Sequence, residues 1–172
     1  MTVVHSASRR GALISSGIMI GAGLGGFIDG IVFHQILQWH SMLSNVRPPV
    51  DLVSMKYNMV WDGVFHVLAW LMTAVGIARL WRAGQRPDVP WSTSTFLGSL
   101  GMGWGLFNST EGVVDHQILG IHHVHPGAQQ LAWDMGFIAS GVIFMAIGWA
   151  AIRAGRTDAT PRGGLAESSP SA

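Results

Sequence analysis

The stretch ALISSGIMIGAGLGGFIDGIVFHQI, residues 12–36, decides the fold of this chain. It is apolar and long enough to cross about 30 Å of hydrocarbon as an α-helix. Three further apolar stretches of similar length follow, and they are residues 59–80, 96–119 and 131–152. None of them alternates polar and apolar residues as the strands of a membrane barrel do. The sequence therefore predicts an all-α fold, a bundle of four transmembrane helices.

The composition excludes several classes of protein. With 49% hydrophobic and 11% charged residues, the 172-residue chain is too apolar for an ordinary soluble domain. It has no cysteine, which excludes disulfides, thiolate metal sites and cysteine nucleophiles. A net charge of +1 and scattered basic residues argue against a nucleic-acid partner. We find no hydrolase or nucleotide-binding motif. Because the chain is so apolar, the expected partner is the lipid bilayer.

The basic residues predict the orientation in the membrane. Eight of the ten would lie on one side of a four-span bundle, and they are Arg9, Arg10, Arg79, Arg82, Arg86, Arg153, Arg156 and Arg162. The positive-inside rule then places both ends of the chain in the cytoplasm. We expect a cytoplasmic N-terminal segment over residues 1–11, a transmembrane domain over 12–152, and a disordered cytoplasmic tail, rich in Gly, Ser, Pro and Ala, over 153–172.

Glycines recur at helical spacing within the apolar stretches. Gly17, Gly21 and Gly25 form one row in the first stretch, with Gly26 and Gly30 on a second row. Gly101 and Gly105 in the third stretch, and Gly136 with Ser140 in the fourth, have the same spacing. Small residues at this spacing let membrane helices approach closely. We interpret these rows as packing surfaces.

The polar residues of the helices fall in an internal repeat. DGIVFHQILQWH at residues 29–40 aligns without a gap on EGVVDHQILGIH at residues 111–122, and Trp61-Asp62 in the second stretch matches Trp133-Asp134 in the fourth. The chain is therefore predicted to consist of two helical hairpins of common design, related by an axis along the membrane normal.

The repeat brings imidazole and carboxylate groups to one layer near the outer ends of the helices. Ionisable groups at membrane depth face the bundle interior and mark functional sites. We predict a metal site for copper, iron or zinc, with His34, Asp62, His66, His116 and Asp134 as direct ligands. Asp29 and Glu111, one turn or more deeper, are expected to orient the imidazoles from behind. His40, His122 and His123 lie further out as further metal ligands, forming a second site for a pair of metals, or as an access path, whereas His5 and His125 are expected to be plain surface residues.

The same motifs carry a family resemblance. Residues 29–40, His116-Gln-Ile-Leu-Gly-Ile-His122-His123 and Leu131-Ala-Trp-Asp134 resemble a bacterial family of predicted membrane proteins, domain of unknown function 2243, over about residues 12–152. The family often has a second histidine where this chain has Ser41. The resemblance implies a multi-pass protein of the bacterial inner membrane and a link to the assembly of respiratory oxidases, which favours copper or haem.

Several functions are compatible with these residues, and whether the protein is an enzyme is left open. The leading hypothesis is a metal site with a redox or metal-delivery role beside respiratory enzymes, in a homo-oligomer or in complex with them. A first alternative is haem b, held by two axial histidines such as His34 with His116 or His66. A second is a structural bundle in which the polar groups form a non-catalytic clasp. A transporter is weakened because the polar residues all lie in the outer half.

Overall fold

A computed structural model describes residues 2–157 of the chain. Four α-helices make up most of it, and they are α1 (Thr2–Ile28), α2 (Leu52–Gly84), α3 (Thr93–Glu111) and α4 (Gln130–Ala154). Two shorter π-helices continue the first and third of them, η1 (Asp29–Ile36) after α1 and η2 (Gly112–Ile118) after α3. Residues 2–157 contain no β-strand, and the predicted all-α fold is confirmed.

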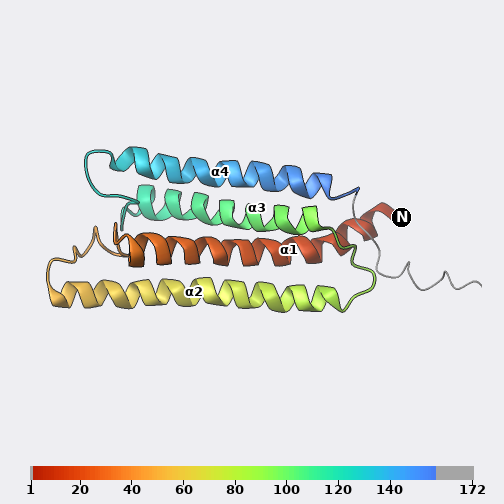
Figure 1. Ribbon diagram of the computed structural model, residues 1–172, viewed down its shortest axis with the longest axis horizontal. Coiled ribbons are helices and arrows are strands. Elements are labelled where there is room, and N and C mark those ends of the chain that lie inside the picture. The colour runs from red at the N-terminus through yellow and green to blue at the C-terminus, as the bar shows by residue number, and fades with distance from the viewer. Residues whose placement is uncertain (1, 158–172) are drawn as a thin grey trace, which may run out of the picture.

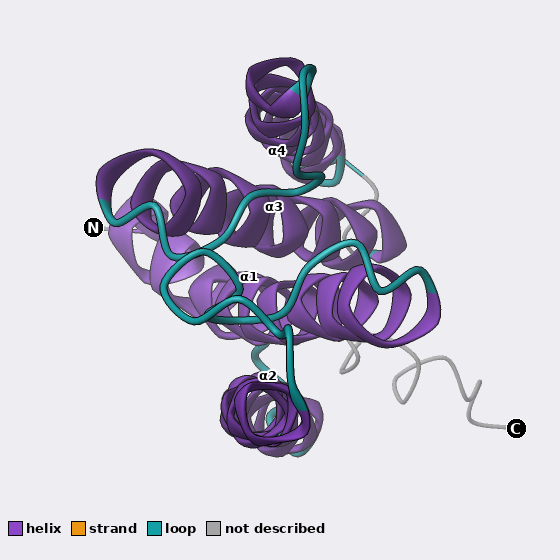
Figure 2. Ribbon diagram, turned by 90° about the vertical axis from the view of Figure 1, so that its left-hand side faces the viewer, coloured by secondary structure: helices purple, strands orange, loops and turns teal. Residues whose placement is uncertain are grey.

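The four helices lie side by side in the order α2, α1, α3, α4. Figures 1 and 2 show α1 and α3 in the middle, with α2 packed on the outer side of α1 and α4 on the outer side of α3. The loops at residues 37–51 and 119–129 lie at one end of the bundle, and the loop at 85–92 lies at the other. Residues on α1 and α3 are therefore the ones enclosed by neighbours on both sides.

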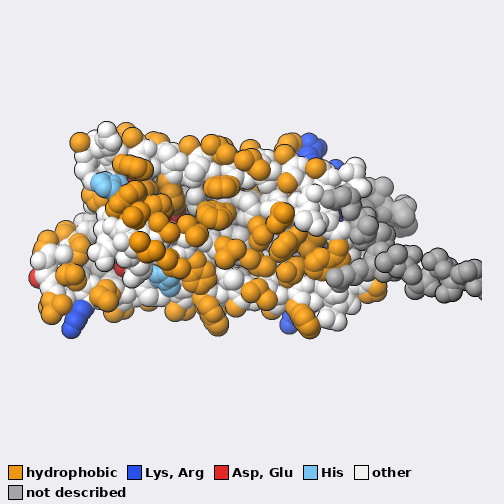
Figure 3. Space-filling model, viewed as in Figure 1, with side chains coloured by type: hydrophobic (Ala, Val, Ile, Leu, Met, Phe, Trp, Pro, Cys, Tyr) orange, Lys and Arg blue, Asp and Glu red, His pale blue; other side chains and the backbone are white. Residues whose placement is uncertain are grey.

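Three segments are long and apolar enough to cross a membrane, namely Arg10–Ile36, Leu52–Gly84 and Gln130–Ala154. The outer helices α2 and α4 expose many large hydrophobic side chains, and hydrophobic side chains are spread along the whole length of the described face in Figure 3. The remaining helix, α3, does not reach the same apolar composition. Its buried residues are small or polar, and they are Thr95, Gly98, Ser99, Gly103, Gly105, Asn108 and Glu111.

Glycines set the close contact between the two central helices. A Cβ atom placed on Gly21 of α1 would overlap the backbone oxygen of Leu100 in α3, and one placed on Gly103 of α3 would overlap the backbone oxygen of Ile18 in α1. Gly136 of α4 was expected to contribute in the same way, but a Cβ there would meet nothing within 4 Å. The close approach of α4 to α3 occurs instead at Gly141 and Gly148.

The helices extend beyond the predicted hydrophobic stretches. Helix α1 already begins at Thr2, within the segment expected to precede the membrane domain, and α4 continues to Ala154. Helix α2 begins at Leu52 because Asp51 caps it: the Asp51 carboxylate accepts a hydrogen bond from the backbone N–H of Ser54 at 2.7 Å. Residues 158–172, most of the tail expected to be disordered, lie outside the described residues.

Candidate metal centre

The end of each central helix is wound as a π-helix and then reverses sharply. In η1 the backbone N–H of Leu37 donates to the oxygen of Val32, five residues back, at 2.8 Å. Gln38 then adopts a φ of 50°, a left-handed conformation that is uncommon outside glycine. The second π-helix ends in the same way, with Leu119 bonded to Val114 at 2.8 Å and Gly120 at a φ of 58°. These reversals turn the following residues back over the end of the bundle.

Two histidines in these reversed segments hold the two outer loops together. The Nδ1 atom of His40 donates to the backbone oxygen of Val124 at 2.9 Å, and Nδ1 of His122 donates to the backbone oxygen of Met42 at 3.0 Å. A carbonyl oxygen can only accept, so Nδ1 carries the hydrogen in both rings. Each Nε2 therefore presents a lone pair, which is the form of imidazole that binds a metal ion.

Carboxylates of the outer helices stand behind the other two central histidines. Nδ1 of His34 lies 3.0 Å from Oδ1 of Asp62 on α2, and Nδ1 of His116 lies 3.5 Å from Oδ1 of Asp134 on α4. Asp62 also accepts the backbone N–H of Met42 at 2.7 Å. Asp134 accepts from Val124 in the same manner at 3.0 Å. Asp62 thus fixes the imidazole of His34 and an outer loop at once, whereas Asp134 fixes the other outer loop and makes no hydrogen bond to Nδ1 of His116.

Asp29 and Glu111 lie on the other side of the imidazoles. Oδ2 of Asp29 is 3.1 Å from Nε2 of His34, and Oε1 of Glu111 is 3.4 Å from Nε2 of His122. Since Nδ1 of each ring already donates elsewhere, Nε2 and the carboxylate oxygen face each other as two acceptors. Such a pair is repulsive unless a proton or a metal ion lies between the atoms.

The buried atoms that lack a hydrogen-bond partner gather at this place. Apart from the oxygens of Asp29 and Glu111, they include Nε2 of all four central histidines, His34, His40, His116 and His122. Three groups of these side chains have ligand atoms within 4.8 Å of one another: His34, His40, His122; Glu111, His116, His122; and Asp29, His34, Glu111. All of these residues are buried. We call the six residues of the three groups the central cluster.

The cluster differs from the predicted ligand set in the positions of its carboxylates. We predict Asp62 and Asp134 as direct ligands and Asp29 and Glu111 as supporting groups; in the structure Asp29 and Glu111 belong to the groups of neighbouring ligand atoms, whereas Asp62 and Asp134 do not. His66 lies outside the cluster, because its Nδ1 donates to the backbone oxygen of Asp62 in its own helix at 2.7 Å. His123 also lies at the periphery, with Nδ1 2.7 Å from Oδ2 of Asp134.

Sequence reasoning did not identify the backbone oxygens of Met42 and Val124, which fix His40 and His122. Nothing in the residue types signals this role, because any residue supplies a carbonyl. His125, expected to be a plain surface residue, is half-buried between Trp39 and Trp133, with ring centroids at 4.9 Å and 5.9 Å.

The two loop histidines are held in the neutral form. Burial, followed by the neighbouring charge of His34, lowers the pKa of His40 from 6.5 to about 4. Burial also lowers the pKa of His122, with His40 as the next cause. Neutral imidazole is the ligand form, so no proton has to leave these rings before a metal binds.

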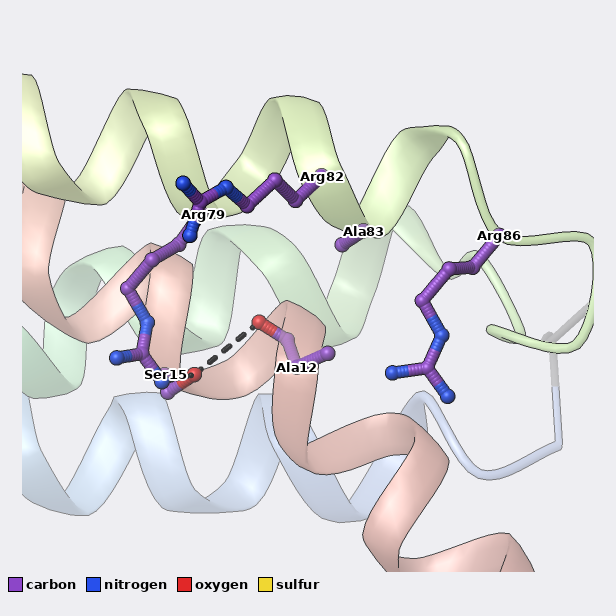
Figure 4. Close-up of a pocket in the computed structure, with 6 residues that line it drawn as sticks. All are labelled: Ala12, Ser15, Arg79, Arg82, Ala83 and Arg86. Carbon is purple, nitrogen blue, oxygen red and sulfur yellow. Dashed lines mark hydrogen bonds between the residues drawn. The ribbon is translucent and has the colours of Figure 1, made fainter.

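Two cavities lie at different distances from the cluster. One, of about 160 Å³, adjoins Asp29 and is lined mainly by aromatic side chains, namely those of Phe33, Trp104, Phe137 and Phe144. A larger cavity of about 220 Å³ lies between α1 and α2 at the opposite end of the bundle, among Arg79, Arg82 and Arg86 (Figure 4). Arg79 donates there to the hydroxyl of Ser15 at 3.0 Å. Of these two cavities, only the first is lined by a residue of the cluster, Asp29.

Comparison with known proteins agrees with the membrane character of the helices. No curated protein and no solved structure matches the chain. A family model described as "Predicted membrane protein (DUF2243)" matches residues 16–155, which include all four long helices from Ser16 onward and the whole central cluster. The chain therefore belongs to the DUF2243 family of predicted membrane proteins.

Proposed function

We propose that this protein is a membrane-embedded metal-binding protein whose ligands are the six residues of the central cluster. One observation carries the proposal: four buried imidazoles with unpartnered Nε2 atoms lie in overlapping groups with two carboxylates whose buried oxygens are also unpartnered. In at least three of these rings Nδ1 is directed at an oxygen acceptor, which fixes the tautomer with a free Nε2.

A purely structural clasp is a poorer account of the same residues. Buried polar groups in proteins are normally paired, and each unsatisfied one destabilises the fold by about 1–3 kcal/mol. A clasp would join imidazoles to carboxylates directly. Here Asp62 makes such a pair with His34, whereas Nε2 of His40 and both oxygens of Glu111 lack any hydrogen-bond partner. A bound cation would satisfy these atoms together.

The roles of the carboxylates follow from their positions. We assign Asp29 and Glu111 as metal ligands beside the four imidazoles. We assign Asp62 and Asp134 as the groups that hold His34 and His116 in place and keep them electron-rich. A set of imidazole and carboxylate ligands without thiolate suits zinc, iron, manganese or copper(II).

Metal ions fit the cluster better than haem does. The rings of His34 and His40 have centroids 4.4 Å apart, and those of His40 and His122 are 4.8 Å apart. The imidazoles therefore contact one another and leave no planar slot between them for a porphyrin.

The proposal also includes the arrangement in the membrane. We propose that α3 with η2 is a fourth span despite its polar residues, since it lies between α1 and α4 and faces protein more than lipid. The matched reversals at Gln38 and Gly120 support two hairpins of common design. Arginines gather at the end opposite the cluster, which supports both ends in the cytoplasm of a bacterium and the cluster toward the outer face.

Burial of the ligands argues for a resident centre. A delivery protein must expose its ligands to a partner, whereas the side chains of His34 and His122 are 0% exposed. We therefore favour a redox role, in association with respiratory enzymes, over metal delivery. The 160 Å³ aromatic cavity beside Asp29 would admit small apolar molecules to such a centre.

The metal content of the purified protein tests the proposal. Wild type purified in detergent should contain stoichiometric iron, manganese, copper or zinc by plasma mass spectrometry, without the Soret band of haem. A His40→Gln, His122→Gln double variant should lose the metal, whereas the control His125→Gln should keep it. A folded wild type that neither contains metal nor takes it up on reconstitution would overturn the proposal.

A further inference from the structure

We infer that the central cluster holds two divalent metal ions, with Glu111 bridging them. The inference rests on the proposed function and deepens it, because a second ion changes the chemistry that the site can support. In two-metal sites the ions lie about 3.5–4 Å apart and can act on one substrate together.

The distances between the ligand atoms favour two ions over one. Bonds from nitrogen or oxygen to such metals are about 2.0–2.2 Å long, so two ligand atoms of one ion are at most about 4.4 Å apart. In the described part of the chain the cluster divides into groups of three, and no group of four has ligand atoms within 4.8 Å of one another. His34 and His116 share no group. Six ligands around a single ion would require all of them to converge, which they do not.

Two of the groups overlap in one residue. Asp29, His34 and Glu111 form one, and Glu111, His116 and His122 form the other. We assign one ion to each of them. Each assigned imidazole offers a single Nε2, but Glu111 has two buried oxygens, and neither has a hydrogen-bond partner. Glu111 is thus the ligand able to supply one atom to each ion.

His40 lies beside the first of these groups, although it shares no group with Asp29 or Glu111. Its ring lies against that of His34, with centroids 4.4 Å apart, and His34 and His40 also belong to a common group with His122. Its Nε2 is buried and unpartnered. One ion then has the imidazole of His34 and the other has those of His116 and His122, with Glu111 bridging them, and His40 is the remaining imidazole ligand beside His34 and His122.

The charge of the region matches two divalent ions. Four buried carboxylates lie in or beside the cluster, those of Asp29, Asp62, Glu111 and Asp134. The ion pairs that the structure shows for them are with histidines and not with lysine or arginine. Two divalent ions would balance the charges of these four buried carboxylates with every histidine neutral, and a fifth carboxylate nearby, that of Asp115, is only half-buried. One ion would leave a net charge of −2 at a depth where uncompensated charge is strongly unfavourable.

Titration of the full-length, metal-free protein with Co²⁺ in detergent tests the inference. Absorption bands of bound Co²⁺ should saturate at two equivalents per chain, and elemental analysis after desalting should give the same count. The variant His116→Gln removes a ligand of one ion only and should saturate at one equivalent. The variant His34→Gln should do the same at the other ion, and His125→Gln is the matched control with two.

The outcomes separate this inference from the proposed function. Saturation of the wild type at one equivalent, with loss of that ion in a cluster variant, would overturn the two-ion centre and leave a metal-binding protein. A wild type that is folded by circular dichroism and binds no Co²⁺ would overturn both. The wild-type count decides the question even if a variant fails to fold.

Discussion

The imidazole rings of His40 and His122 stack face to face, with centroids 4.8 Å apart and planes 4° from parallel. Two protonated rings would repel each other strongly at this distance in a buried site. The stack therefore requires at least one neutral ring, in agreement with the low pKa of His40. It also aligns two lone-pair nitrogens, neither of which has a hydrogen-bond partner. The two histidines belong to the cluster and also bond to the backbone of the outer loops.

Replacing Asp62 should weaken metal binding without removing a ligand. The change Asp62→Asn replaces the carboxylate that accepts from Nδ1 of His34 and from the backbone of Met42. Loss of such a supporting group typically lowers metal affinity about 10–100-fold. A competition assay with a chelator of known affinity measures this change. Asp88→Asn, in the loop at the far end, is the control and should have wild-type affinity. Equal affinity for Asp62→Asn and wild type would contradict the assigned role.

Removal of the metal should lower the thermal stability. A ligand that binds only the folded protein stabilises it by about 2.7 kcal/mol when its concentration is 100 times its Kd. The metal-free protein would also keep the buried, uncompensated carboxylates of Asp29 and Glu111. We expect a lower Tm after chelation and recovery when the metal is returned, followed by intrinsic tryptophan fluorescence. The double variant His40→Gln, His122→Gln should show no difference between the two conditions. A chelator effect of equal size in that variant would argue against the cluster as the binding site.

The metal-free protein should lose stability as the pH falls below 6.5. His40 has a pKa of about 4 when folded and about 6.5 when unfolded. Between these values the unfolded chain binds more protons, so the free energy of unfolding decreases as the pH decreases. The Tm of the apoprotein should therefore drop between pH 7 and pH 5. The variant His40→Gln should show a shallower dependence. A profile as steep as that of the wild type would place the responsible proton elsewhere.

Alanine at the contact of the central helices should destabilise the fold. The changes Gly21→Ala and Gly103→Ala each place a methyl group against backbone of the facing helix, which cannot move aside as a side chain does. Overpacking of this kind costs about 1–3 kcal/mol, and direct overlap with backbone places these sites at the upper end. Gly63→Ala is the control, since a Cβ there meets nothing within 4 Å. Chemical denaturation in detergent compares the three variants. A Gly63→Ala variant that loses as much stability as Gly103→Ala would contradict the packing argument.

The helices could be predicted from the sequence because the thickness of the membrane sets the length of an apolar helix that crosses it. The stretch at 131–152 corresponds to α4 at Gln130–Ala154 with small shifts at each end. The predicted start of α2 at residue 59 is about two turns late, since the Asp51 cap and not hydropathy sets the start of the helix at Leu52. The apolar composition of a stretch does not reveal a helix cap such as Asp51.

The members of the site could be predicted in part, but their arrangement could not. The matching motifs at 29–40 and 111–122 do contain all six residues of the central cluster. An α-helical rise places Asp29 about 7–8 Å below His34, whereas the π-helical winding of η1 brings Oδ2 of Asp29 within 3.1 Å of that ring. Long π-helices are rare, and they cannot be predicted from the types of residue that form them. The reversal at Gln38 is equally local, yet it decides where His40 lies.

The most direct test of the metal centre is anomalous X-ray diffraction from crystals of the full chain, measured on both sides of the absorption edge of the metal identified by elemental analysis. We expect anomalous density among Nε2 of His34, His40, His116 and His122 and the oxygens of Asp29 and Glu111, resolved as two peaks at sufficient resolution. A metal peak bound elsewhere, with only water or direct imidazole–carboxylate hydrogen bonds in the cluster, would contradict it.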